Sequence, residues 1–441
     1  MIDHTAFPPR TALFHTLGCK LNFAETSTVA REFAARGIMR VQQGDDPDLV
    51  VVNTCSVTEL ADKKCRQLIR QFVRRYPRAT VIVTGCYAQL RPGDVAEIPG
   101  VAVVAGNDRK AELGKWLDRW LATHETQQAI TPAAEISSFT PSCSRGDRTR
   151  WFLKVQDGCD YWCTYCTIPM ARGRSRSPMI ADLVAQARQA AAEGACEIVL
   201  TGVNIGDFGH RTGETFDELC HALATVDGVE RYRISSIEPN LLTDSLVDWI
   251  AAGGDGAKFM PHFHIPLQSG SDEVLRLMRR RYDTAMFRRK IDKIRSMIPD
   301  AFIGVDLMVG CRGETQECFD ECRAFVESLD ISRLHVFPYS ERPGTRALGI
   351  GHVVSQEEKH RRAHRMITLS ERKLADFASR FSGTVRPVLL EHVRPDGTMG
   401  GFTDNYLRVE TDPRPEKANT IVAVKLGDFD GETFRGEAVE A

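Results

Sequence analysis

The organisation of this chain is set by the stretch Lys154-Val155-Gln156-Asp157-Gly158-Cys159-Asp160-Tyr161-Trp162-Cys163-Thr164-Tyr165-Cys166. Its cysteines have the spacing C-x3-C-x2-C, which places three thiols in one short loop. Gly158 suits the tight backbone of such a loop. Thiolates ligate iron–sulfur clusters, and a cluster with three thiolate ligands leaves one iron free to bind another molecule. The spacing also allows a zinc loop that takes a fourth ligand from a distant His or Cys.

Length and composition describe a globular protein of several domains. The chain has 441 residues and predicts two to four domains, because single cores stop growing near about 250–300 residues. Hydrophobic residues make up 42% and charged residues 26%, as in ordinary soluble proteins. The formal net charge is −2, so that any binding of nucleic acid must depend on local basic patches.

The cysteines indicate metal binding in a reducing compartment. They number thirteen, which is odd, and they are dispersed over a long chain. The first ten residues lack the apolar segment of a signal peptide, and no apolar run approaches the roughly 18 residues of a membrane span. We therefore expect a cytoplasmic protein without a membrane segment, in which reduced thiols bind metal and do not form disulfides.

Near the N-terminus, three short apolar runs each lead into a cysteine: Cys19, Cys55 and Cys86. Their β-branched residues predict buried parallel strands with helices between them, at the spacing of a βαβ unit of roughly 30 residues. The carboxyl ends of neighbouring parallel strands share one edge, so we expect these thiols to converge there. Three unrelated buried cysteines are the alternative. Cys65 falls within a predicted helix and is not expected to be a ligand.

The central region predicts a partial TIM-like barrel. Residues 127–147 are polar and aperiodic and predict a linker. From Trp151 onward, strands alternate with amphipathic helical patterns, and the cysteine loop follows the first strand. In such barrels the functional residues lie at the carboxyl ends of the strands. The six candidate strands are Phe152–Gln156, Ile198–Thr201, Tyr232–Ser235, Phe263–Leu267, Phe302–Met308 and Leu334–Pro338. The fold class is thus α/β, with this barrel over residues 148–380.

The loop of Cys159, Cys163 and Cys166 resembles the signature of the radical S-adenosylmethionine (SAM) enzymes. In that family a 4Fe–4S cluster on three such cysteines chelates the amino and carboxylate groups of SAM. Reductive cleavage of SAM then yields a 5′-deoxyadenosyl radical. The resemblance implies that these three cysteines hold the radical-generating cluster.

Further residues of the barrel are candidates for contact with SAM. Tyr165 lies beside Cys166, where it is placed to pack on the cluster or on the adenine. Each of the others follows or ends a predicted strand, on the expected catalytic face: Gly202, Ser236, Glu238 and Asp306. Polar residues at strand ends also serve in local hydrogen bonding, which is the alternative for each of them.

A basic segment follows the cysteine loop and contains Arg172, Arg174 and Arg176. Because it adjoins the expected active site, we predict that these guanidinium groups bind a phosphate or a substrate carboxylate. Two later basic runs, Arg279–Arg281 and Arg288–Lys290, are interpreted as solvated helix faces.

The C-terminal residues 381–441 change character after a long helix over residues 355–381. Short alternating runs around the turn Asp396-Gly397 predict a small β-barrel. This segment resembles a TRAM domain, an OB-like RNA-binding module. The resemblance implies that Phe402 and Tyr406 stack on bases and that Arg408 meets a phosphate.

The order of these parts is similar to that of the methylthiotransferases over essentially the whole chain. The segments around Cys19, Cys55 and Cys86 resemble the N-terminal domain of that family, which places it at residues 10–126 here. The resemblance implies that these cysteines hold a second, auxiliary 4Fe–4S cluster with its own open iron.

Three segments are most similar to the branch that acts on N6-threonylcarbamoyladenosine in tRNA. They are Thr167–Ser177, Pro338–Thr345 and Gly401–Tyr406. Met170 departs from the tyrosine expected in the first of them, which weakens the assignment to this branch but not the assigned chemistry.

The implied reaction converts C2–H of the adenine at tRNA position 37, beside the anticodon, into a methylthio group. One SAM supplies the methyl group, a second supplies the radical, and the auxiliary cluster carries the sulfur. Implied partners are the tRNA anticodon loop, a reductant such as flavodoxin or ferredoxin, and a sulfur source. No catalytic residue is identified. Three alternatives stay open: action on N6-isopentenyladenosine in tRNA, action on a ribosomal-protein aspartate, and a zinc-stabilised RNA-binding protein without catalysis.

Overall fold

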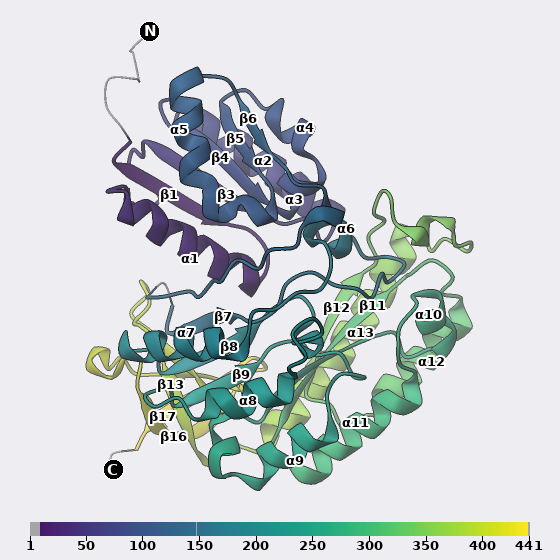
Figure 1. Ribbon diagram of the computed structural model, residues 1–441. Coiled ribbons are helices and arrows are strands. Elements are labelled where there is room, and N and C mark those ends of the chain that lie inside the picture. The colour runs from purple at the N-terminus through teal and green to yellow at the C-terminus, as the bar shows by residue number, and fades with distance from the viewer. Residues whose placement is uncertain (1–8, 147, 440–441) are drawn as a thin grey trace.

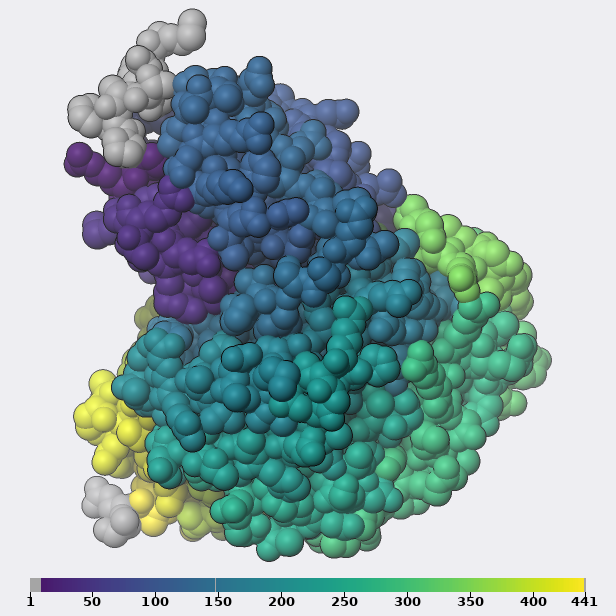
Figure 2. Space-filling view, viewed as in Figure 1, coloured from purple at the N-terminus to yellow at the C-terminus, as the bar shows by residue number. Residues whose placement is uncertain are grey.

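The computed structural model describes residues 9–146 and 148–439 (Figure 1). Residues 1–8, 147 and 440–441 lie outside the described residues. The first of these ranges makes up most of the N-terminal stretch in which we expect no signal peptide. Three parts follow one another along the chain: an N-terminal α/β part, a central partial barrel and a small C-terminal β-barrel. Figure 2 shows these parts packed into one continuous body. Within the described residues, no helix combines the length and the apolarity needed to cross a membrane.

The N-terminal part is built on a parallel sheet with the strand order β2-β1-β3-β4-β5-β6. Alternate residues of β3 enter separate cores, with Val50 and Val52 on one face and Leu49 and Val51 on the other. Because both faces are buried, the strand must be apolar throughout, which explains its unbroken hydrophobic run. The strands are β1 (Thr11–Thr16), β2 (Met39–Arg40), β3 (Leu49–Thr54), β4 (Thr80–Gly85), β5 (Val101–Ala105) and β6 (Gln127–Ala129).

Helices cover both faces of this sheet. The helix α2 (Glu59–Arg75) packs on one face through Cys65, Ile69 and Phe72. The helices α1 (Lys20–Ala35) and α5 (Leu113–Thr123) pack on the other. The short helices are α3 (Cys86–Leu90), α4 (Pro92–Ala96) and the 3-10 helix η1 (Asn107–Glu112).

The segment predicted as a linker is partly ordered into the sheet. Its first residues form β6, which pairs with β5, and Cys143 bridges Leu153 in an antiparallel arrangement. No periodic pattern marks this strand, because β6 has three residues and two of them are glutamine. The 3-10 helix η2 (Ala133–Glu135) follows.

The central part confirms the predicted partial barrel. All six predicted strands are present, and they are parallel within the sheets β7-β8-β9 and β10-β11-β12. A parallel bridge between Ser236 and His264 connects the two sheets. No pairing joins β7 to β12 in the described part of the chain, so the barrel is open there. The strands are β7 (Arg150–Lys154), β8 (Glu197–Thr201), β9 (Arg231–Ile234), β10 (His262–Gln268), β11 (Phe302–Val309) and β12 (Arg333–Pro338).

Helices surround this barrel on its outside (Figure 1). Inward-facing residues of these helices and outward-facing residues of the strands share one large hydrophobic core. The helices are α6 (Ile168–Arg172), α7 (Ile180–Ala192), α8 (Phe216–Ala224), α9 (Asp244–Ala252), α10 (Asp272–Leu277), α11 (Thr284–Met297), α12 (Gln316–Glu327) and α13 (Gln356–Ser379), with 3-10 helices η3 (Ile205–Asp207), η4 (Gly254–Lys258) and η5 (Arg346–Gly349). The last long helix, α13, leads into the C-terminal part, as the sequence predicts.

The C-terminal part is a closed five-stranded barrel with the order β13-β14-β15-β17-β16, which confirms the predicted β-barrel. It packs against the end of the central barrel opposite the cysteine loop. There Arg233 of β9 donates hydrogen bonds to the carbonyls of Thr403 and Asp404, each at 2.8 Å. The elements are β13 (Val385–Leu390), β14 (Met399–Thr403), β15 (Arg408–Thr411), η6 (Pro415–Lys417), β16 (Ile421–Phe429) and β17 (Thr433–Ala438).

Candidate functional site

The loop of Cys159, Cys163 and Cys166 leaves the carboxyl end of β7, on the face where the barrel fold places function. Gly158 at its start has φ +72°, and a Cβ there would meet the carbonyl oxygen of Arg174 at 2.0 Å. Only glycine therefore lets the loop lie against the segment that follows α6.

The thiols of this loop are free and receive N–H donors. The backbone N–H of Tyr161 donates to Sγ of Cys159, and that of Ile168 donates to Sγ of Cys166, both at 3.4 Å. Burial raises the pKa of Cys159 and of Cys166 to about 12, so that binding of iron by either thiol releases a proton. None of the three cysteines forms a disulfide.

Arg280, which we interpreted as part of a solvated helix face, is buried at this loop. Its guanidinium group donates to Sγ of Cys163 at 3.2 Å and to the hydroxyl of Tyr165 at 3.3 Å, and it forms an ion pair with Glu238. A cation in contact with sulfur stabilises the thiolate form. This role could not be predicted, because the three consecutive arginines differ only in their three-dimensional surroundings.

The three N-terminal cysteines follow adjacent parallel strands, as the sequence predicts: β1, β3 and β4 are neighbours in the sheet. Cys19 is the N-cap residue of α1, and Cys86 is the first residue of α3. Gly18, with φ +103°, lies so close to Cys55 that an added Cβ would be 3.0 Å from its Sγ. The N-terminal end of a helix such as α1 favours negative charge, which suits thiolates at this edge.

The two cysteine loops are held against each other by contacts between the N-terminal part and the barrel. Arg342, which follows β12, donates to the hydroxyl of Ser56 at 2.8 Å and pairs with Asp62 at 2.6 Å. Asn107 donates to the carbonyl of Ala171 at 2.9 Å. Ser56 follows Cys55, and Ala171 lies in α6, so that these bonds tie both cysteine loops together.

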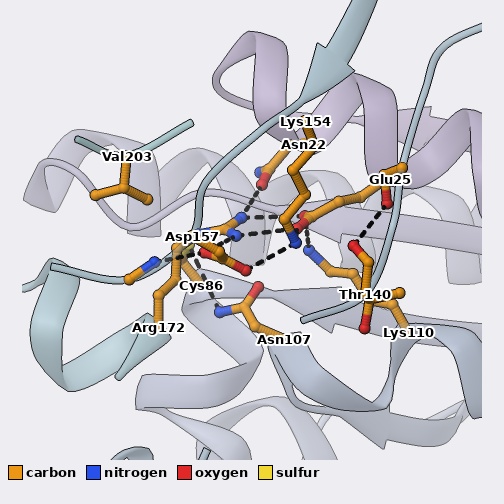
Figure 3. A network of polar contacts seen from close by, with 12 residues as sticks. Asn22, Glu25, Cys86, Asn107, Lys110, Thr140, Lys154, Asp157, Arg172 and Val203 are labelled. Carbon is orange, nitrogen blue, oxygen red and sulfur yellow. Dashed lines mark hydrogen bonds and ion pairs between the residues drawn. The ribbon is translucent and has the colours of Figure 1, made fainter. Parts of the chain in front are cut away.

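A network of buried charges lies beside the N-terminal cysteines (Figure 3). Glu25 of α1 forms ion pairs with Lys154 at 2.9 Å and with Arg172 at 3.0 Å, and also with Lys110. Asp157 pairs with Lys154 at 2.8 Å and with Arg172 at 2.9 Å. Every one of these side chains is at most 3% exposed. The network therefore joins α1 and η1 to the barrel through charge pairs that water does not screen.

This network corrects the expected role of two arginines. Arg172 and Arg176, predicted to face the substrate, are 1% and 5% exposed. Arg176 pairs with Asp157 at 2.9 Å, and Arg172 is engaged as described above. Both guanidinium groups are engaged by buried carboxylates, so neither is free to bind a substrate. Arg174, between them, is exposed.

The network should make the fold sensitive to acid. Burial raises the pKa of Glu25 and of Asp157, but nearby cations outweigh this and hold both pKa values below their usual range. Arg172 and Lys154 act on both carboxyls, Lys110 acts on Glu25, and Arg176 acts on Asp157. The two carboxylates make their full contribution to the free energy of unfolding above about pH 4, which is near their pKa values in the unfolded state. This contribution is lost as the pH falls below that value. We expect the free energy of unfolding in urea to fall between pH 6 and pH 3 more steeply for the wild type than for Asp157→Asn. Equal slopes for the two proteins would contradict this.

The five residues predicted to contact SAM lie around the cysteine loop. Tyr165 is held by Arg280, and Glu238 also binds Arg280. Burial raises the pKa of Glu238, an effect that Arg280 opposes. Oδ1 of Asp306 lies at hydrogen-bonding distance, 2.8 Å, from Nε2 of His264. Gly202 lies against Gln156, just before the cysteine loop, and Ser236 pairs with His264.

Gly202 and Ser236 hold backbone in place. A Cβ on Gly202 would lie 2.8 Å from the carbonyl oxygen of Gln156, so the loop after β8 packs directly on the loop after β7. Gln156 accepts hydrogen bonds from the N–H groups of Val203, at 3.0 Å, and Asn204, at 2.8 Å. Ser236 forms the bridge between the two sheets of the barrel.

Polar residues that were not predicted from the sequence are free to bind a ligand here. Both side-chain polar atoms of Asn204 are buried without a partner, as are Oδ2 of Asp207 and Oδ1 of Asn240. A buried polar atom without a partner is costly, so such atoms mark a place for a polar ligand or water. Their position after strands β8 and β9 was the available signal.

A cavity of about 260 Å³ opens between the two cysteine loops. Its wall includes Val57 and Thr58, which follow Cys55, together with Tyr165, Cys166 and Asp306. The residues that follow β12 complete it on a third side. A small molecule or a base in this cavity would meet both loops at once.

The predicted RNA-contacting residues of the C-terminal barrel face the central barrel. The ring of Tyr406 stacks on Phe402, with centroids 5.0 Å apart, and lies 4.1 Å from the ring of His262. Arg150 covers Phe402 at 4.0 Å. These two rings are therefore already stacked within the protein, whereas Arg408 is exposed.

The surroundings of the first three cysteines are compatible with a cluster. Among the described residues, no group of three or more His, Cys, Asp or Glu side chains is placed to hold one metal ion. Free thiols with N–H donors and a neighbouring guanidinium group are the surroundings that such a cluster requires.

Comparison with known proteins agrees with this geometry. Residues 11–106 match the model described as uncharacterized protein family UPF0004, and residues 153–326 match that of the radical SAM superfamily. The fold is similar to that of the radical S-adenosylmethionine methyltransferase TsrM from Kitasatospora setae. The TM-score is 0.55 at 15% identity, over 77% of this chain and 74% of that one.

Curated relatives are similar over nearly the whole chain. The threonylcarbamoyladenosine tRNA methylthiotransferase MtaB of Bacillus subtilis is 37% identical, over 94% of this chain and 93% of the relative. The MtaB of Aquifex aeolicus is 34% identical, over 92% and 98%. The tRNA-2-methylthio-N(6)-dimethylallyladenosine synthase of Thermobifida fusca is 34% identical, over 86% and 78%. The chain belongs to the radical SAM methylthiotransferase family.

Proposed function

We propose that this enzyme inserts a methylthio group at C2 of N6-threonylcarbamoyladenosine at position 37 of tRNA. The observation that carries the proposal is a cavity of about 260 Å³ whose wall includes Cys166 of the first set of cysteines and Val57 and Thr58, which follow Cys55 of the second set. The relatives named MtaB, at 34–37% identity over most of the chain, support the choice of nucleoside.

Each cysteine loop would hold one 4Fe–4S cluster. Cys159, Cys163 and Cys166 would hold the cluster that binds SAM, and Cys19, Cys55 and Cys86 would hold the auxiliary cluster. When bound, these groups supply a radical that removes hydrogen from C2 and a sulfur for the new carbon–sulfur bond.

The chain's own residues position the reactants. Arg280 fixes Tyr165 and Glu238 beside the first loop, where they can orient SAM. Asn204 has amide atoms free for a polar ligand in the same region. The bonds of Arg342 and Asn107 hold the two loops together and so set the distance between them.

The substrate RNA would approach along exposed basic and C-terminal residues. Arg174 and Arg408 are exposed and free to meet phosphates. We assign the C-terminal barrel as a TRAM domain that binds the anticodon arm. Phe402 and Tyr406 would contact RNA at the cavity that they line. The proposal also includes a reductant such as flavodoxin or ferredoxin, a sulfur source and a cytoplasmic location. The domain boundaries at residues 126, 147 and 380 stay predictions.

Cys55→Ala tests the division of labour between the loops. The variant should still cleave SAM but form no methylthio product, because the first loop is intact and the second is not. The measurement is 5′-deoxyadenosine by chromatography and modified nucleosides by mass spectrometry. Cys196→Ala, at a half-buried cysteine outside both loops, is the matched control and should keep both activities. Methylthio product from Cys55→Ala would contradict the assignment.

Two further measurements separate the alternatives. The dimethylallyladenosine enzymes are also 34% identical, so tRNA nucleosides from a deletion strain should be compared by mass spectrometry. Loss of the methylthio group from threonylcarbamoyladenosine alone supports the proposal. Loss from isopentenyladenosine, or from a ribosomal-protein aspartate, favours those substrates. Zinc without acid-labile sulfide in anaerobically purified protein would exclude the radical chemistry.

A further inference from the structure

A second cavity, of about 380 Å³, lies between strands β10 to β12 of the central barrel, α1 and the C-terminal barrel. Alternate residues of the barrel strands face it, while their neighbours in sequence enter the hydrophobic core. The strands contribute His264, Gly304 and His335 to its wall, α1 contributes Lys20, and the C-terminal barrel contributes Tyr406. Three parts of the chain thus enclose one polar space of the size that holds a small ligand.

This cavity adjoins the one beside Cys166, and a hydrogen-bonded pair of side chains lies between the two. His264 lines the larger cavity and bonds to Asp306 at 2.8 Å, and Asp306 lines the smaller one beside Cys166. Lys20 enters the larger cavity as the residue directly after Cys19. A molecule whose reacting atom lies between the loops can therefore extend a side arm past Asp306 toward Lys20.

The wall of the larger cavity has cationic and polar groups without partners. The ammonium group of Lys20 has no hydrogen bond or ion pair among residues 9–146 and 148–439. Nδ1 of His262, a residue 4% exposed, is buried without a partner. Arg333, by contrast, is neutralised by Glu432 at 2.9 Å. The unsatisfied groups call for an anionic, hydrogen-bonding ligand.

We propose that Lys20 binds the carboxylate of the threonylcarbamoyl group and thereby selects this nucleoside over one with a hydrocarbon arm. The inference rests on the proposed function. Adenine carries its substituent at N6, on the ring that also contains C2, so the arm and the reacting atom enter together. A dimethylallyl arm would leave Lys20 and His262 unpaired in the cavity, which penalises the wrong substrate. An RNA phosphate lies on the outside of its strand and fits an enclosed space less well.

The test uses the complete enzyme with three RNA hairpins of the same sequence. One carries N6-threonylcarbamoyladenosine, the second carries its methyl ester, which lacks the negative charge, and the third carries N6-isopentenyladenosine. For the wild type, kcat/KM should be about 10–100-fold higher with the acid than with the ester. Lys20→Met should lose this preference through a raised KM, with kcat for the acid retained, because the contact is present in both ground and transition states.

Two variants complete the design. Lys20→Arg keeps the positive charge and should restore most of the preference for the acid. Lys115→Met changes an exposed lysine of α5 and should leave the preference as in the wild type. The comparison of acid with ester in the wild type needs no variant, so the test does not depend on how Lys20→Met folds.

The outcomes distinguish this inference from the proposed function. A wild type that modifies acid and ester equally, or a Lys20→Met that keeps the full preference, would overturn the role of Lys20 alone. Equal loss of activity on the acid and the ester in Lys20→Met would also overturn the role of Lys20, because the lysine would then not act through the carboxylate. A wild type that forms no methylthio product from the acid hairpin, but does so from the isopentenyl hairpin, would overturn both.

Discussion

Cys159→Ala is expected to abolish both SAM cleavage and methylthio transfer. The thiol lies in the loop after β7 with an N–H donor from Tyr161, and alanine offers no ligand in its place. A cluster with two thiolates in place of three loses the geometry that leaves one defined iron open. The measurements are the release of 5′-deoxyadenosine, the amount of methylthio nucleoside and the iron content per chain. The first two should be lost, and the iron content should fall to about half, because one of two clusters is missing.

The contrast with the other loop makes this result specific. Cys159→Ala should remove 5′-deoxyadenosine entirely, whereas Cys55→Ala should reduce only the methylthio product. Cys220→Ala, at a buried cysteine of α8, is a control for the loss of a thiol from the barrel. SAM cleavage at the wild-type rate in Cys159→Ala would show that the loop does not bind SAM.

Glu25→Ala is expected to have the largest effect on stability. Its carboxylate is 2% exposed and pairs with Lys154 and Arg172, which are equally buried. Removal of one partner from a buried ionic network leaves charges without compensation, at a cost of about 3–5 kcal/mol. Urea unfolding monitored by circular dichroism should show this loss, together with weaker contact between α1 and β7.

A variant on the same helix provides the comparison. Glu32→Ala changes a half-buried glutamate two turns further along α1 and should cost less than about 1 kcal/mol. If Glu25→Ala and Glu32→Ala lowered the free energy of unfolding by similar amounts, the buried ion pairs of Glu25 would not contribute the expected stability.

Much of the fold could be predicted because its signals are local. Apolar strands that alternate with amphipathic helices gave the parallel order of β1, β3 and β4, and hence the common edge of their cysteines. The same alternation gave the six strands of the central barrel. Such patterns can be recognised in the sequence because each strand must be apolar on every face that it buries.

The roles of the charged residues could not be predicted, because they depend on distant partners. Arg172 was expected to face a substrate, but its partner Glu25 is 147 residues away in sequence. Arg280 was read as solvated, but it contacts Cys163 across 117 residues. Nothing in the local composition distinguishes a basic residue at the surface from one that neutralises a buried carboxylate or thiolate.

The buried network has a consequence for the order of assembly. It contains four cations, Lys110, Lys154, Arg172 and Arg176, but only two carboxylates, Glu25 and Asp157. Arg172 interacts electrostatically with Cys19 and Cys86. If these cysteines hold the auxiliary cluster as proposed, their thiolates would balance the excess positive charge. Loading of that site and docking of the N-terminal part on the barrel would then be thermodynamically linked, and loss of iron would loosen the junction between the two parts.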